Sequence, residues 1–317
     1  MKRIQLLLLL VMGPWILMSQ PSWRDSVDVS LPLEGGSLQG TLFTPLGIKK
    51  PPVVLIIAGS GPTDRNGNSP MVAGKNNSLL QLADSLASHG IASLRYDKRG
   101  IAKSQVKGLK EENMRFGDGV NDAIAWIQWL KSKGYKKIYI AGHSEGSLVG
   151  MAAANLEKLS GFVSLAGSGR RIDIVLREQL QAGTGPDSLK QLAGRYLDTL
   201  LSGARLAKPS PLLFSLFRPS VQPYMISWLQ YDPYSLMASL SCKTLIVQGK
   251  KDIQINETDA RLLHEANPKS LLVLVDDMNH VFKAVKTDSR VDNLKAYSDA
   301  SLPVMGELVQ AMVKFIN

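Results

Sequence analysis

The chain alternates short apolar runs with longer segments in which apolar residues recur every three or four positions. The run Val53–Ile57 is continuous and rich in β-branched residues, as in a strand buried on both faces of a sheet. Residues 79–89 have helical spacing that stops at Gly90. Further strands are expected at 91–96, 138–141, 162–166, 244–247 and 271–275, and further helices at 120–130, 147–159 and 303–316. This alternation predicts an α/β fold with a mostly parallel, doubly wound sheet covered by helices.

Two further strands precede this series. Residues 27–33 and 38–43 flank the turn sequence Glu34-Gly-Gly-Ser37. They predict an N-terminal β-hairpin that extends one edge of the sheet.

One long segment interrupts the alternation. Between residues 166 and 244 the chain has leucines at helical spacing, followed by many prolines and aromatic residues, and no convincing strand. A segment of this length usually carries function or its own structure. We expect residues 168–240 to form a helical cap over the carboxyl ends of the strands, where open α/β sheets bind ligands. The core around the sheet would then consist of residues 20–167 and 241–317.

The first residues have the three parts of a secretory signal. Lys2 and Arg3 precede the apolar run 4–18, and a small residue and a polar break follow. The run is shorter than the roughly 20 residues that span a bilayer. We expect residues 1–19 to be a cleaved signal peptide, the protein to be exported to the periplasm or the medium, and no stable membrane span to remain. An uncleaved N-terminal anchor is the alternative.

The distribution of charge and the cysteine content limit which partners and cofactors the chain could bind. The formal net charge is +10, but the basic residues occur in scattered pairs with no long basic run, which argues against a nucleic-acid partner. The single cysteine, Cys242, excludes a disulfide framework and a thiolate metal cluster within the chain. Because the sequence has no nucleotide-binding loop either, we expect neither a cofactor nor a metal.

The segment Gly142-His-Ser-Glu-Gly146 carries the strongest chemical signal. It follows an expected strand directly and precedes an expected helix. In that context the central serine sits on a sharp, strained turn, and the flanking glycines avoid collisions with neighbouring backbone. We therefore predict Ser144 as a nucleophile, which needs a base to take its proton.

The expected base and acid follow two later strands at the same edge of the sheet. His280 comes after the last expected strand, and Asp252 comes after the strand 244–247. The chain order serine, acid, histidine fits a triad in which the acid orients the histidine. Asp173 is the alternative acid. The other histidines lie within the turn or near helix ends: His143, His89 and His264.

Acyl transfer also needs donors for the developing oxyanion. One candidate is the backbone N–H of Glu145, the first residue after the nucleophile. The other is the backbone N–H of Ser60, in the glycine-rich loop 58–68 that follows the first buried strand.

Together these residues resemble the α/β-hydrolase superfamily over nearly the whole chain after residue 19. The segment Tyr96–Ser104 resembles the Asp-x-Arg-Gly-x-Gly-x-Ser segment of many members, with Ala102 in place of the second glycine. Asp97 and Arg99 are expected to have structural roles there. The chain is similar to secreted bacterial carboxylesterases of the serine-aminopeptidase-like (S33-type) branch. The resemblance implies an α/β-hydrolase fold and hydrolysis of esters through an acyl-serine intermediate.

The leading hypothesis is a serine carboxylesterase that acts on small-molecule esters of small or medium acyl groups. Aromatic residues of the expected cap would line an acyl pocket or simply fill the core of the cap: Phe214, Phe217, Tyr224 and Trp228. The first alternative is a serine aminopeptidase or peptidase, which would need acidic residues in the cap, such as Asp187, Asp198 or Asp232. The second is an inactive binding protein on a hydrolase scaffold.

Overall fold

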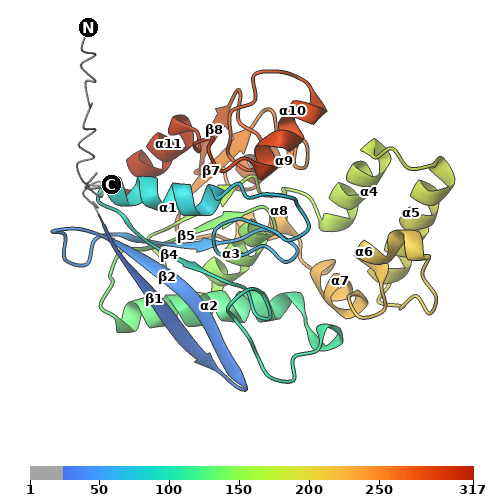
Figure 1. The fold of residues 1–317 in the computed structure, drawn as a ribbon, viewed down its shortest axis with the longest axis horizontal. Coiled ribbons are helices and arrows are strands. Elements are labelled where there is room, and N and C mark those ends of the chain that lie inside the picture. Colours follow the sequence, from blue (N-terminus) through green and yellow to red (C-terminus); the bar gives the residue numbers. More distant parts are fainter. Residues whose placement is uncertain (1–23) are drawn as a thin grey trace, which may run out of the picture.

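A computed structural model describes residues 24–317, so the predicted signal peptide lies outside the described residues. Eight strands form one sheet in the order β1-β2-β4-β3-β5-β6-β7-β8 (Figure 1). The six strands from β3 to β8 are parallel to one another, which confirms the predicted mostly parallel sheet. The strands are β1 (Arg24–Leu33), β2 (Gly36–Pro45), β3 (Val53–Ile57), β4 (Ala92–Tyr96), β5 (Ile138–His143), β6 (Gly161–Leu165), β7 (Lys243–Gly249) and β8 (Leu271–Val275).

The N-terminal hairpin is present at one edge of this sheet. β1 pairs with β2 from Arg24 opposite Pro45 to Leu33 opposite Gly36, so the hairpin is longer than predicted. Its two-residue turn places Gly35 at φ 77°, a left-handed conformation that glycine adopts without strain. β2 then continues the sheet by pairing antiparallel with β4.

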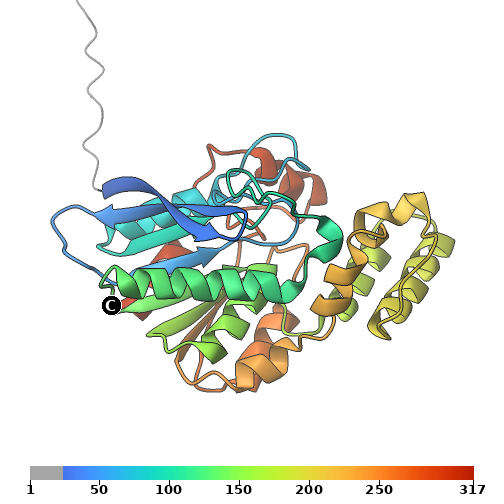
Figure 2. The same cartoon turned by 90° about the horizontal axis from the view of Figure 1, so that it is seen from below.

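β3 shows why a central strand can be apolar at every position. Val54 and Ile56 pack into one hydrophobic cluster, and the other three residues of β3 pack into a second cluster on the opposite face. Helices therefore cover the sheet on both sides, as Figures 1 and 2 show. The helices are α1 (Ser78–Ser88) and α11 (Gly306–Ile316) on one face, and α2 (Phe116–Ser132), α3 (Glu145–Leu156) and α9 (Glu257–Ala266) on the other.

The long segment between β6 and β7 is helical. Its first four helices extend away from the sheet in both views (Figures 1 and 2), whereas the last one, α8, returns to pack against α3 and α9. These helices are α4 (Ile172–Ala182), α5 (Asp187–Leu201), α6 (Phe214–Phe217), α7 (Gln222–Trp228) and α8 (Pro233–Ala238), and α10 (Arg290–Lys295) follows β8. Within residues 24–317, no helix is both long and apolar enough to cross a membrane.

α3 lies against the sheet at backbone-to-backbone distance. A Cβ atom on Gly146 would lie 2.4 Å from the carbonyl oxygen of Ile57 and 2.6 Å from that of Ala58. A Cβ atom on Gly142 would lie 2.1 Å from the carbonyl oxygen of Gly146. Real Cβ atoms cannot approach backbone this closely, so only glycines allow β5 to turn directly into α3 under β3.

We expect Gly146→Ala to lower the free energy of unfolding by about 3 kcal/mol, because the added methyl group must push α3 away from β3. Gly306→Ala is the matched control, since nothing lies within 4 Å of a Cβ atom at that position. Urea unfolding followed by circular dichroism measures both variants. Equal stabilities for the two variants would show that α3 does not need this close approach.

A short loop after β8 carries His280 and is anchored by a buried lysine. Lys283 is fully buried, and its Nζ donates to Gln81 Oε1 on α1 and to the carbonyl oxygen of Leu302. Asn279 Oδ1 accepts the backbone N–H groups of Val281 and Lys283. Burial lowers the pKa of Lys283 from the usual 10.5 to about 8.

This lysine makes stability depend on pH in the alkaline range. Between about pH 8 and 10.5 the folded chain has lost the Lys283 proton while the unfolded chain keeps it. The unfolded state then binds more protons, so the free energy of unfolding rises with pH through this window. We expect Lys283→Met to remove this rise, and denaturant unfolding at pH 8 and pH 10 checks it. The exposed control Lys295→Met should keep the pH dependence of the unsubstituted protein.

Candidate active site

The loops after β7 and β8 bring Asp252 and His280 together. His280 Nδ1 lies 2.7 Å from Asp252 Oδ2, and the two side chains are 4% and 0% exposed. Because a carboxylate only accepts, this bond requires a proton on Nδ1 and leaves Nε2 of the neutral ring as an acceptor. That is the tautomer that a general base needs.

Asp252 is held by three donors besides His280. The backbone N–H groups of Gln254 and Ile255 donate to Oδ1 at 2.7 and 3.0 Å. Gln248 Nε2 donates to Oδ2 at 3.2 Å. Sequence reasoning did not identify Gln248, although its place at the end of β7, in the same turn as the acid, is a usable signal. These bonds fix the carboxylate that orients His280.

Ser144 occupies the turn between β5 and α3. Its backbone has φ 55° and ψ −120°, which is uncommon for a residue with a side chain and costs roughly 1–3 kcal/mol. Its N–H donates to the carbonyl oxygen of Leu165 at 2.9 Å. The structure thus has the strand, strained turn and helix that the Gly142–Gly146 motif predicts.

Among the hydrogen bonds of residues 24–317, none joins Ser144 Oγ to His280 Nε2. Catalytic hydrogen bonds of this kind often become short only when a substrate binds. His143 connects the two parts of the site instead. Its Nε2 lies 2.9 Å from the carbonyl oxygen of His280, and the two rings are 4.7 Å apart. Burial holds the pKa of His143 well below its usual value, so the ring stays neutral. Sequence reasoning gave His143 no such supporting role.

The loop after β3 approaches the serine closely. A Cβ atom on Gly59 would lie 3.2 Å from Ser144 Cβ, so the backbone just before Ser60 borders Ser144. Thr63 Oγ1 donates to the carbonyl oxygen of Ser60 at 2.8 Å. Lys98 Nζ, from the segment after β4, donates to the carbonyl oxygens of Gly59 and Gly61.

Two further residues of the segment Tyr96–Ser104 hold neighbouring loops in place. Asp97 is buried and accepts from the backbone N–H and the guanidinium of Arg65, both at 2.8 Å. Arg99 forms an ion pair with Asp122 on α2. Asp97 and Arg99 therefore have the structural roles expected of them.

Glu145 connects the turn to the helical segment. As the first residue of α3, its N–H group precedes those bonded within the helix and is available to a ligand. Its side chain accepts a hydrogen bond from the hydroxyl of Tyr224 on α7. Burial, and then the Glu145 carboxylate, raises the pKa of Tyr224 well above its usual value, so Tyr224 remains a neutral donor.

The four aromatic residues proposed for a pocket have different surroundings. Tyr224 reaches Glu145, and Trp228 stacks on Phe116 with ring centres 6.0 Å apart. Phe217 is fully buried against Tyr196, within the core of the helical segment. Phe214 is 43% exposed. Only Tyr224 and Trp228 thus lie on the helix that contacts the turn.

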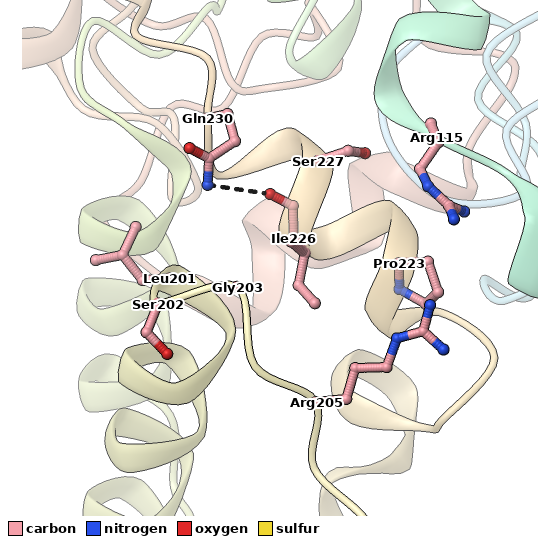
Figure 3. Close-up of a pocket in the computed structure, with 9 residues that line it drawn as sticks. All are labelled: Arg115, Leu201, Ser202, Gly203, Arg205, Pro223, Ile226, Ser227 and Gln230. Carbon is pink, nitrogen blue, oxygen red and sulfur yellow. Dashed lines mark hydrogen bonds between the residues drawn. The ribbon is translucent and has the colours of Figure 1, made fainter.

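A cavity of about 490 Å³ lies between the helical segment and Arg115, which precedes α2 (Figure 3). It is lined by the end of α5, by α7 and by Arg115, and neither Ser144 nor His280 borders it. Figure 3 shows Arg115 and Arg205 on the same side of α7, near Pro223. This cavity is separate from the cluster around Ser144.

No three side chains of histidine, cysteine, aspartate or glutamate within residues 24–317 are arranged so that they could hold a metal ion.

Comparison with known proteins adds to this geometry. A profile of the serine aminopeptidase S33 family matches residues 74–234, which include the Ser144 turn. Esterase EstD of Thermotoga maritima is 26% identical over 292 residues, an alignment that covers 87% of this chain and 66% of that esterase. The chain therefore spans just under two-thirds of the length of this relative.

Solved structures show the same fold. Est1E from Butyrivibrio proteoclasticus superposes with a TM-score of 0.57 at 16% identity, covering 91% of this chain and 98% of that one. The esterase Pf2001 of Pyrococcus furiosus has a TM-score of 0.53 at 16% identity and covers 92% of each chain. At such identities the likeness concerns the fold alone. Because the family profile covers about half of the chain and includes the turn at Ser144, this protein belongs to the serine aminopeptidase S33 family of α/β hydrolases.

Proposed function

We propose that this protein is a serine hydrolase that cleaves carboxylic esters of small or medium acyl groups. The observation that carries the proposal is the buried Asp252–His280 pair at the same sheet edge as a serine on a strained turn. The similarity to an esterase of Thermotoga maritima and the family membership support it.

In the proposed reaction Ser144 Oγ attacks the ester carbonyl carbon while His280 Nε2 takes the hydroxyl proton. The carbonyl oxygen becomes an oxyanion that accepts from the backbone N–H groups of Ser60 and Glu145. The C–O bond to the alcohol then breaks, and the alcohol leaves with the proton from His280. A water molecule then attacks the acyl carbon while His280 takes its proton. The bond to Ser144 Oγ breaks, the carboxylic acid leaves, and His280 returns the proton to Oγ.

Asp252 makes His280 an effective base. When His280 becomes an imidazolium, its positive charge lies 2.7 Å from a buried carboxylate. Backbone N–H groups already fix that carboxylate, so it needs no reorganisation during the reaction. The second alternative, an inactive scaffold, is disfavoured because this pair is fully assembled.

The helical segment 168–240 is proposed to act as a cap on the substrate. Tyr224 reaches Glu145 from α7, and Trp228 follows one turn later on the same helix. Aromatic rings at this place would suit an acyl chain better than a charged group. The rest of the segment extends beyond the carboxyl ends of the strands (Figure 2). We also propose export of the protein, on the basis of the basic start and apolar run of residues 1–19.

The family name makes an aminopeptidase the competing function, and it would need a free carboxylate for the substrate ammonium. The acidic residues expected to serve are engaged elsewhere. Asp198 is paired with Arg177 at 2.5 Å, and Asp187 lies 3.7 Å from Lys190. Asp232 caps the N-terminus of α8. These contacts favour the esterase.

The nucleophile can be tested directly. We expect the purified protein to hydrolyse p-nitrophenyl butyrate and to be labelled by a fluorophosphonate at Ser144. Ser144→Ala should lose the label and lower kcat by at least about 10⁴-fold, because the chemistry of the triad depends on it. Ser239→Ala, an exposed serine outside the site, is the control. Undiminished hydrolysis by Ser144→Ala would refute the proposed mechanism.

Ester and peptide activities can be separated with matched chromogenic substrates. We expect kcat/KM to be much higher for p-nitrophenyl butyrate than for alanine p-nitroanilide. The reason is that Asp187, Asp198 and Asp232 of the helical segment already have partners and are not available to bind the substrate ammonium. Initial rates are measured at 405 nm at substrate concentrations well below KM. The slope of rate against concentration, divided by the enzyme concentration, gives kcat/KM. Faster release of nitroaniline than of nitrophenol would instead identify an aminopeptidase.

A further inference from the structure

Lys98 contacts the loop that carries one of the two proposed oxyanion donors. It follows β4 by two residues, and its side chain crosses to the loop after β3. Nζ donates to the carbonyl oxygen of Gly59 at 2.5 Å and to that of Gly61 at 2.7 Å. These two carbonyl groups flank Ser60, whose N–H is proposed to bind the oxyanion.

The bond to the Gly59 carbonyl oxygen acts on the peptide unit that carries the first proposed oxyanion donor. The carbonyl of Gly59 and the N–H of Ser60 belong to one peptide unit. A hydrogen bond accepted by an amide oxygen polarises that amide and strengthens its N–H as a donor. The donor here is a charged ammonium, whose hydrogen bonds are roughly twice as strong as neutral ones.

The charge of Lys98 is directed at this loop. Within residues 24–317, no carboxylate forms an ion pair with its Nζ, and the adjacent Asp97 is engaged by Arg65. Burial lowers the pKa of Lys98, and the Glu145 carboxylate opposes this shift and so favours the ammonium. Glu145 is also the residue that supplies the second proposed oxyanion donor. The positive charge therefore lies against the carbonyl oxygens on either side of Ser60, the first proposed donor.

The second bond fixes the direction of the loop. Gly61 has φ 68°, so the chain turns sharply after Ser60. With Gly59 packed against Ser144 and both flanking carbonyls held by one ammonium, the Ser60 peptide has little freedom to rotate. Preorganised donors of this kind pay no reorganisation cost when the oxyanion forms.

We propose that Lys98 is a positioning residue of the oxyanion hole, which holds the Gly59–Ser60 peptide and strengthens the Ser60 N–H toward the transition state. The role rests on the proposed ester hydrolysis. It differs from a merely structural tie between two loops, because it acts on the tetrahedral state and not on the bound substrate. It therefore affects kcat and leaves KM nearly unchanged.

The test compares Lys98→Met and Lys98→Arg with Lys103→Met, a control in the same segment whose side chain is 70% exposed. Active sites are counted with a fluorophosphonate at completion, so that unfolded protein does not enter kcat. Hydrolysis of p-nitrophenyl butyrate yields kcat and KM. Inhibition by an alkyl trifluoromethyl ketone, which forms an oxyanion on the serine, reports on the tetrahedral state.

We expect Lys98→Met to lower kcat about 10- to 100-fold, less than or similar to the loss of one oxyanion donor. KM should change little, and the affinity for the trifluoromethyl ketone should fall by the same factor as kcat/KM. Lys98→Arg, which keeps a cationic donor, should recover part of kcat. Lys103→Met should match the unsubstituted protein. If Lys98→Met does not fold, Lys98→Gln carries the same expectation.

An unchanged kcat, a loss that appears only in KM, or unchanged affinity for the ketone in an active Lys98 variant would overturn the role of Lys98 alone. An unsubstituted protein that neither cleaves the ester nor binds the ketone would refute the proposed function, and the role of Lys98 with it.

Discussion

The turn at Ser144 is the constraint on which the rest of the site depends. Its backbone is strained, with φ 55° at a residue that has a side chain, and it persists because the surrounding structure leaves no alternative. Gly142 and Gly146 let the start of α3 lie against the backbone of β3, and the N–H of Ser144 is held by Leu165 on β6. Three adjacent strands thus determine where the serine stands. Every other group of the site is arranged around that position.

The parallel sheet explains how residues distant in sequence reach one edge. Loops at the carboxyl ends of five strands contribute Gly59, Lys98, Ser144, Asp252 and His280, one from each loop. Each of these loops is held by its own hydrogen bonds, such as those of Asp97 with Arg65 and of Asp252 with Gln254. Buried polar groups stabilise a structure only when they are satisfied, and here they also orient one another. The strain at Ser144 is therefore offset by a network that spans the sheet edge.

The helical segment contacts this network through polar bonds, such as those from Tyr224 to Glu145 and from Gln179 to the carbonyl oxygen of Gln254. An aromatic ring of α7 also stacks on Phe116. The segment's own core is built by residues such as Phe217, packed on Tyr196. The aromatic residues of the segment therefore divide between internal packing and the site. Composition could not separate these two roles, since a phenylalanine in a core and one in a pocket have the same sequence signature. A residue's place on α6 or α7 decides which role it has.

The sequence by itself determined the alternation of strands and helices, the N-terminal hairpin and the order of serine, acid and histidine, because each depends on local periodicity or on which strand a residue follows. It could not reveal that α8 returns to the core, that His143 binds the backbone of His280, or that Gln248 holds Asp252. The bond from Lys98 to the Gly59 carbonyl joins loops that follow two different strands. Only the tertiary structure decided these contacts, because they depend on the order of strands in the sheet. Neighbours in the sheet are not neighbours in the chain, and side chains from adjacent loops meet only once the sheet has formed.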